Sequence, residues 1–224
     1  MGQEPLGLDE ALGQWRSWLD ELVVQVVELR EKRDLLLALQ NNRTALEQTP
    51  HLRELCSQTA WLCLESIITD IRRCVRGRKD SVTLSGLMES IRDKADLLTR
   101  EWFLGRFKRE LMHIGASTFE RFGPNGAASI SSTIVQKDVD ELREVTKSLC
   151  TIADRAIAHI DKRAWEKKDQ YACSAPYVAQ CVEYISSVLG RYYLLVRGSD
   201  LSPDAANLPD WDFILRQLAA KCHR

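Results

Sequence analysis

The 224-residue sequence lacks several features that would each point to a function. Its seven cysteines include no Cys-x-x-Cys pair, which excludes the usual spacing of a zinc site and of a disulfide framework. No apolar stretch approaches the roughly 20 residues that cross a bilayer. Residues 1–5 lack the basic start and apolar run of a signal peptide. The net charge is only -1, so any binding of phosphate must come from a local patch.

These absences limit the cellular compartment and the kinds of ligand that we expect for the protein. Scattered single cysteines on apolar stripes behave as small hydrophobic residues, which favours a reducing cytoplasm. We therefore expect a cytoplasmic protein that binds no membrane, no metal and no cofactor. Gly123 and Gly126 lie in a turn-rich loop, but no strand precedes them and no Gly-Lys-Ser or Gly-Lys-Thr follows, so the loop is not a P-loop.

Strand patterns are absent as well, and apolar residues recur instead at intervals of three and four. This spacing predicts helices over residues 8–42, 51–76, 82–91, 93–121, 134–163, 176–197 and 209–215. We predict an all-α fold, a single-domain up-and-down helical bundle with long helices and a short C-terminal helix. The domain covers residues 1–224, with a core over about 8–198. Residues from about 199 to 224 form a clamp, in which Trp211 and Phe213 pack on the bundle.

The helix over 134–163 has the most regular apolar seam in the chain and is expected in the middle of the bundle. Four candidate catalytic residues gather at its end: His159, Arg155, Asp154 and Asp161. Arg155 precedes His159 by one helical turn, so both project from the same side. A histidine transfers protons near neutral pH and an arginine stabilises a phosphate, so the pair suits cleavage of RNA by its own 2′-hydroxyl. The alternative is a capping and ion-pair cluster, worth at most about 1 kcal/mol when exposed.

Basic residues mark a second candidate surface. A run at the end of the helix over 51–76 and a pair after His159 are the candidate RNA-binding residues: Arg72, Arg73, Arg76, Arg78, Lys79, Lys162 and Arg163. Cations suit the negative end of a helix dipole, so a solvated helix terminus is one interpretation of the run. The other is a phosphate-binding patch, because guanidinium groups match phosphate geometry.

Four stretches carry a family resemblance. Residues 153–161 resemble the Arg-Asn/Asp-Lys-x-Ile/Val-Ala-His-x-Asp signature of HEPN domains, in particular the AbiU-like branch associated with abortive phage infection. Residues 80–84 resemble the Glu-Asn-Leu-Ser-Leu of this family, and residues 191–199 its Tyr-x-Leu-Leu-x-Gly-Ser. Asp210-Trp211 resembles its terminal Asp-Trp. The resemblance covers about residues 15–216.

The resemblance implies a helical bundle that forms a homodimer, with the motif helices of two subunits meeting at a shared cleft. It also implies a protein of bacterial defence or of a toxin-antitoxin pair, acting as a metal-independent endoribonuclease beside a nucleotidyltransferase antitoxin. In that version His159 handles protons, Arg155 stabilises the phosphate, and Asp154 and Asp161 orient the histidine or a water.

The motif departs from the family at one position. Ala153 stands where active members carry the arginine that works with the histidine. Arg155 is the nearest arginine, and Arg76 or Arg106 are alternative sources. The competing expectations are a noncatalytic module that binds RNA, a nucleotide or another protein, and a purely structural helical adaptor.

Overall fold

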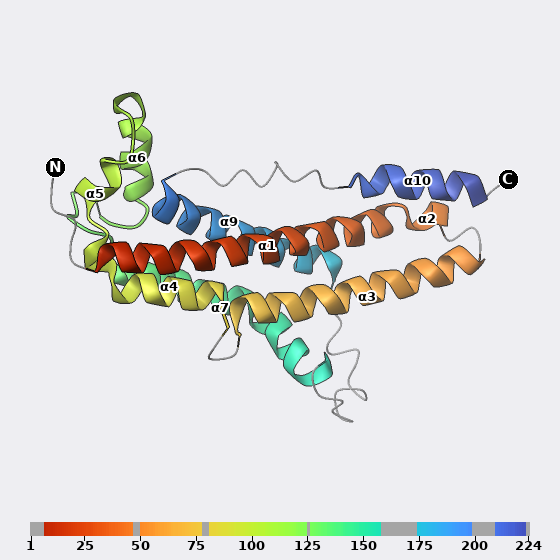
Figure 1. Cartoon of the computed structure of the whole chain (residues 1–224). Coiled ribbons are helices and arrows are strands. Elements are labelled where there is room, and N and C mark those ends of the chain that lie inside the picture. The colour runs from red at the N-terminus through yellow and green to blue at the C-terminus, as the bar shows by residue number, and fades with distance from the viewer. Residues whose placement is uncertain are drawn as a thin grey trace. The chain divides into compact units, whose positions relative to one another are not determined.

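The computed structural model describes residues 7–46, 50–77, 81–124, 126–157, 174–198 and 209–222. In these ranges every regular element is helical, so the predicted all-α helical bundle is confirmed (Figure 1). The long helices are α1 (Leu8–Asn41), α3 (Pro50–Val75), α7 (Ser132–Ile152) and α9 (Ala175–Arg197). The shorter ones include α2 (Arg43–Leu46), α4 (Leu84–Asp93), α5 (Arg100–Leu104), α6 (Met112–Phe119) and α10 (Trp211–Cys222).

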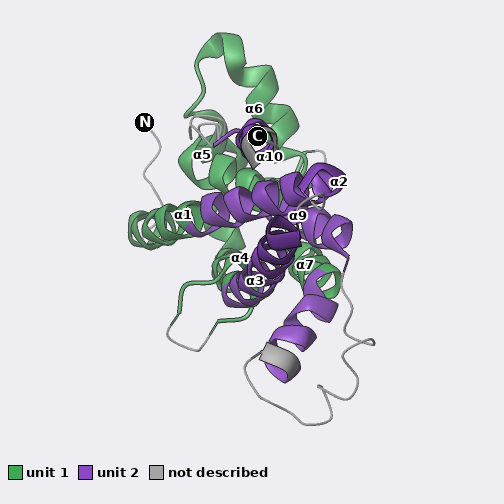
Figure 2. Ribbon diagram, turned by 90° about the vertical axis from the view of Figure 1, so that its right-hand side faces the viewer, with its two compact units in different colours: residues 1–24, 74–145, 186–202 green, residues 25–73, 146–185, 203–224 purple. Residues whose placement is uncertain are grey.

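The chain divides into two compact units, coloured separately in Figure 2. Unit 1 consists of residues 1–24, 74–145 and 186–202. Unit 2 consists of residues 25–73, 146–185 and 203–224. Each long helix contributes residues to both units. The organisation of residues 1–224 as a single domain stays a prediction.

Within unit 1, α1 buries the apolar row that its sequence spacing predicts. The fully or almost fully buried members are Leu8, Leu12, Trp15, Leu19 and Leu22. The indole Nε1 of Trp15 donates a hydrogen bond to Ser90 Oγ of α4 at 2.9 Å, which satisfies its polar atom inside the core. The start of α4 is fixed by Thr83, whose Oγ1 accepts from Gly86 N at 3.0 Å as an N-cap.

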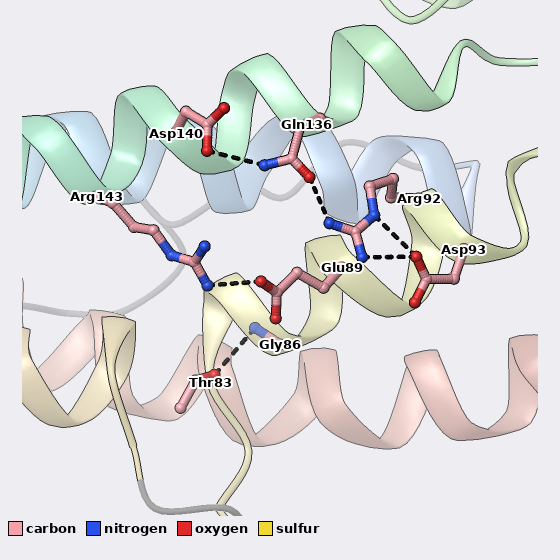
Figure 3. Close-up of polar contacts among 8 residues, drawn as sticks. All are labelled: Thr83, Gly86, Glu89, Arg92, Asp93, Gln136, Asp140 and Arg143. Atoms are coloured by element: carbon pink, nitrogen blue, oxygen red, sulfur yellow. Dashed lines mark hydrogen bonds and ion pairs between the residues drawn. The ribbon is translucent and has the colours of Figure 1, made fainter.

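A row of polar contacts joins α4 to α7 inside unit 1 (Figure 3). Arg143 Nη2 donates to Glu89 Oε1 at 2.5 Å. One turn or more away, Arg92 donates to the side-chain oxygen of Gln136, whose Nε2 in turn donates to Asp140 Oδ1 at 2.8 Å. These contacts fix the register of the two helices outside their apolar seam, but exposed pairs of this kind contribute little to stability.

The single helix predicted over 93–121 is wrong. The segment contains η1 (Ala95–Leu97), α5, η2 (Arg109–Leu111) and α6 instead. Backbone groups at the first break pair with the loop that follows Phe122: Arg100 N donates to Ala128 O at 2.8 Å, and Ile130 N donates to Leu98 O at 3.2 Å. Because these groups bond across the chain, they are not available for a continuous helix.

Within unit 2, α10 packs on the end of α1 and on α2. Leu215 is buried in a cluster with Leu39 and Leu46, and Trp211 packs against the same cluster. Asn42 Nδ2 donates to Asp212 Oδ1 at 2.7 Å. The predicted contact of Trp211 is thus confirmed, whereas that of Phe213 is wrong, because Phe213 is 60% exposed. Phe213 lies two residues from both Trp211 and Leu215, so it projects from another side of the helix.

Candidate functional site

The sequence-predicted site begins where α7 ends. From Ala153 to Ile157 the helix continues as a π-helical segment, η3, with no α-helical turn. The prediction that an α-helix runs through these residues is therefore wrong. Hydrogen bonds in a π-helix join residues five apart rather than four, so the α-helical spacing used to align Arg155 with its neighbours does not hold in this segment. Segments of this kind are frequent at functional sites.

Ala153, at the position of the family's arginine, is packed in the interior with only 2% of its surface exposed. Asp154 is half-exposed, and Arg155 is exposed. Asp154 and Arg155 are the two predicted catalytic residues that the structure describes, and both lie at the surface of unit 2. Ala153, which lies between them and the end of α7, belongs to the core of this unit.

Asp154 is held by an arginine from the predicted RNA-binding set. Arg72 Nε, near the end of α3, donates to Asp154 Oδ1 at 2.6 Å, and both side chains are partly exposed. Two stretches that lie 82 residues apart in the chain are thereby joined within unit 2. A pair of this exposure contributes on the order of 1 kcal/mol or less to stability, so its main effect is positional.

A second ion-pair group lies beside Arg72 on α3. Asp70 accepts from Lys32 Nζ at 2.5 Å and from Arg73 Nη1 at 3.3 Å. Arg73 remains 67% exposed, while Asp70 is mostly covered. We call Lys32, Asp70, Arg72, Arg73, Asp154 and Arg155 the α3–η3 cluster. These six residues comprise four cationic and two anionic side chains, and the printed ion pairs join Lys32 and Arg73 to Asp70, and Arg72 to Asp154.

The remaining predicted site residues divide into two groups. Arg76 follows the end of α3, is exposed, and belongs to unit 1. The others lie outside the described residues: His159, Asp161, Arg78, Lys79, Lys162 and Arg163. Their predicted roles stay predictions.

Arg106, considered as a substitute catalytic arginine, has a structural role in unit 1. Its Nη1 donates to Val196 O at 2.7 Å and its Nη2 to Leu195 O at 2.6 Å, which satisfies carbonyls at the C-terminus of α9. Its guanidinium stacks 4.0 Å from the ring centre of Trp102. Burial, with a smaller contribution from Arg16, lowers the pKa of Arg106 to about 10, so it stays charged at neutral pH.

Two buried charged residues, Arg33 and Asp138, were not predicted from the sequence, although helical spacing places each of them on the inward side of its helix. Arg33 lies four residues after Leu29 on the inward row of α1, is 8% exposed, and pairs with Asp34 and Glu183. In unit 1, Asp138 follows the buried Val135 by three residues and accepts from the hydroxyl of Tyr192 at 3.0 Å. A charged residue at an inward position of a helix predicts such a partner.

Comparison with known proteins finds no matching family model, no similar curated protein and no similar solved structure. No helix among the described residues has the length and apolar character needed to cross a membrane. In the same ranges, no group of three or more histidine, cysteine or acidic side chains is arranged to hold a metal ion.

Proposed function

We propose that the chain is a HEPN-like RNA-binding protein whose α3–η3 cluster contacts the phosphate backbone. The observation that supports this most strongly is the ion pair between Arg72 and Asp154, because it joins the basic end of α3 to the segment that resembles the family signature. Arg73 and Arg155 each follow one member of this pair in the sequence, and both are exposed. Arginine is suited to phosphate because its planar fork donates two parallel hydrogen bonds.

Binding without cleavage is the activity we favour. Ala153 has no group that could stabilise a phosphate, and its side chain is packed in the interior. Asp154, which the resemblance implies orients a histidine or a water, accepts a hydrogen bond from Arg72 through Oδ1. A metal-independent ribonuclease that uses His159 and Arg155 is the alternative.

Binding is tested by fluorescence anisotropy of a labelled single-stranded RNA in EDTA. We expect replacement of both Arg73 and Arg155 by Gln to weaken binding by about tenfold or more, because each charged contact to phosphate contributes about 1 kcal/mol and 1.4 kcal/mol is tenfold. Arg216→Gln is the matched control, since Arg216 is also an exposed arginine of unit 2 but lies on α10, outside the cluster. Equal affinity of the double variant and the wild type would refute the proposed surface.

Cleavage is followed in the same samples by gel electrophoresis. We expect intact RNA with both the wild type and His159→Ala. RNA products that form with the wild type and disappear with His159→Ala would support the ribonuclease alternative instead.

The family resemblance also leads us to propose a cytoplasmic homodimer of bacterial defence or of a toxin-antitoxin pair, with a nucleotidyltransferase as antitoxin. The homodimer is tested by light scattering at micromolar concentration. We expect twice the mass of 25.6 kDa that one chain has. A monomeric mass would count against a cleft shared by two subunits.

A further inference from the structure

The connection between α5 and α6 forms a projecting tip of unit 1. Figures 1 and 2 show it extending away from the long helices of this unit. Its inner side is packed, because Phe107 lies on the buried Phe103 with ring centres 5.2 Å apart, and a Cβ at Gly115 would lie 2.9 Å from Phe107 Cδ2. Gly115 thus lets α6 approach Phe107 closely, and this packing supports the end of the connection. We call residues 108–114 the α5–α6 tip.

Three large apolar side chains lie on the outside of this tip. Leu111, Met112 and Ile114 are 45%, 39% and 45% exposed. His113 between them is exposed as well. η2 ends at Leu111 and α6 begins at Met112, and each residue of a helix is rotated by about 100° from the one before it. The four consecutive exposed residues therefore point to different sides of the chain axis.

This arrangement differs from the face that a helix presents to a groove of another protein. A helix that docks in a groove has its apolar residues spaced by three and four, so that they lie on one side. A tip that exposes consecutive apolar residues is suited to a medium that surrounds it. The boundary between the headgroups and the acyl chains of a bilayer is such a medium.

Two cations lie at the start of the same tip. Lys108 and Arg109 are exposed, and within the described ranges neither of them forms an ion pair or a side-chain hydrogen bond. Glu110 is the only carboxylate in the sequence of residues 108–114, so two cations and one anion leave a net charge of +1 with His113 neutral. Cations beside an apolar tip are attracted by the negative surface of a membrane that contains anionic lipids.

We propose that the α5–α6 tip binds the surface of a bilayer that contains anionic phospholipids. Leu111, Met112 and Ile114 insert at the boundary between headgroups and acyl chains. Lys108 and Arg109 contact the lipid phosphates. Binding of this kind is peripheral and reversible, so it needs no helix that crosses the bilayer, and the expectation from the sequence that the chain binds no membrane rested on the absence of such a helix. The tip belongs to unit 1 and shares no residue with the α3–η3 cluster, so either proposal can fail without the other.

The first test is co-sedimentation of the full chain with vesicles of phosphatidylcholine and phosphatidylglycerol in equal amounts. We expect replacement of both Leu111 and Ile114 by Ser to weaken binding about tenfold or more, because the apolar area that enters the bilayer is lost. Val24→Ser is the matched control, since Val24 is a 58% exposed apolar residue of unit 1 that lies on α1, outside the tip. Thermal unfolding verifies that the variants are folded. No binding of the wild type at millimolar lipid, or equal binding by the double variant and the wild type, would overturn the proposal.

The second test separates charge from apolar contact. We expect replacement of both Lys108 and Arg109 by Gln to weaken binding to the anionic vesicles about tenfold or more, because each cation near an anionic surface contributes about fivefold. The wild type should bind vesicles of phosphatidylcholine alone more weakly by about the same factor. Arg121→Gln is the matched control, because Arg121 is an exposed arginine beyond the other end of α6. Equal binding of the wild type to the two kinds of vesicle would contradict the assigned role of the cations.

Two further results would assign the binding or the tip elsewhere. Replacement of both Arg73 and Arg155 by Gln should leave vesicle binding unchanged, and its loss would place vesicle binding on the α3–η3 cluster instead. Light scattering of the Leu111→Ser and Ile114→Ser double variant should give the same mass as the wild type. A lower mass for this variant, without vesicle binding by the wild type, would show that the tip contacts a second copy of the chain and would overturn the proposal.

Discussion

A buried carboxylate in unit 1 illustrates how much a single polar atom can contribute. Asp138 is 7% exposed, accepts from the Tyr192 hydroxyl at 3.0 Å, and lies 3.3 Å from Arg191 Nη2. Removing one hydrogen-bond partner of a buried charged group destabilises the folded state by more than that hydrogen bond contributed. The charged group gave up its contact with water on folding, and without the partner nothing compensates for that loss.

We therefore expect Tyr192→Phe to lower the free energy of unfolding by about 1–3 kcal/mol, measured by urea denaturation. Tyr193→Phe is the control, because it makes the same change at the next residue, whose ring lies 5.8 Å from the Arg197 guanidinium. It should change the free energy of unfolding by less than about 0.5 kcal/mol. Equal effects of the two substitutions would show that Asp138 does not depend on the Tyr192 hydroxyl.

Titration of Cys56 is a second prediction for a single residue. Burial raises the pKa of its thiol above the ordinary value of 9.0. A raised pKa leaves less thiolate at any given pH, and the thiolate is the reactive form. We expect Cys56 to react with iodoacetamide more slowly at pH 8 than a small free thiol, with a midpoint of its pH-rate profile above 9.0. A midpoint below 9.0 would contradict burial as the controlling factor.

Two glycines near the C-terminal end of α9 have different surroundings: Gly190 lies inside the helix, and Gly198 directly follows it. Gly198 follows the helix with a φ of +71°, and an added Cβ would lie 3.3 Å from Arg106 Cζ. Gly190 lies inside the helix, where an added Cβ would have no neighbour within 4 Å. The same substitution should therefore have opposite effects at the two positions.

We expect Gly198→Ala to destabilise the protein by about 1–2 kcal/mol, because a side chain is strained in the left-handed region. Gly190→Ala should stabilise it by about 0.5–1 kcal/mol, because alanine is the better helix former. Thermal unfolding of both variants tests the pair. A lower melting temperature for both variants would contradict the open space that the structure shows where a Cβ at Gly190 would lie.

Helices with continuous apolar rows could be predicted closely from the sequence. The predicted start of α1 at Leu8 agrees with the structure, and the row through Trp15 is buried as its spacing indicates. The segment over 93–121 could not be predicted, because its break depends on backbone bonds from Arg100 and Ile130 that hydrophobic spacing does not record. The π-helical segment that begins at Ala153 could not be predicted either, because backbone hydrogen bonds between residues five apart rather than four leave no trace in the pattern of apolar residues.

At the scale of the whole molecule, the sequence indicated which residues could belong to a site, but it did not indicate which of them contact one another in the fold. Asp154 and Arg72 were assigned separately to catalysis and RNA binding, and their contact across 82 residues depends on tertiary packing. A pocket in unit 2 is also a product of packing, because its lining includes Leu36 and Leu39 of α1, Leu46 of α2 and Leu64 of α3, which no sequence motif connects. The buried Ala153 could be interpreted only after the family resemblance gave its position a meaning.

Phosphate binding by the α3–η3 cluster is the central claim, and the salt dependence of RNA affinity tests it most directly. Each phosphate contact on a single strand contributes about 0.7 to the slope of log K against log salt concentration. Replacing Arg73 and Arg155 by Gln should therefore reduce the magnitude of the slope by about 1.4 relative to the wild type, whereas Arg216→Gln should leave it unchanged. A slope that is the same in the double variant and the wild type would contradict the claim that these arginines contact RNA.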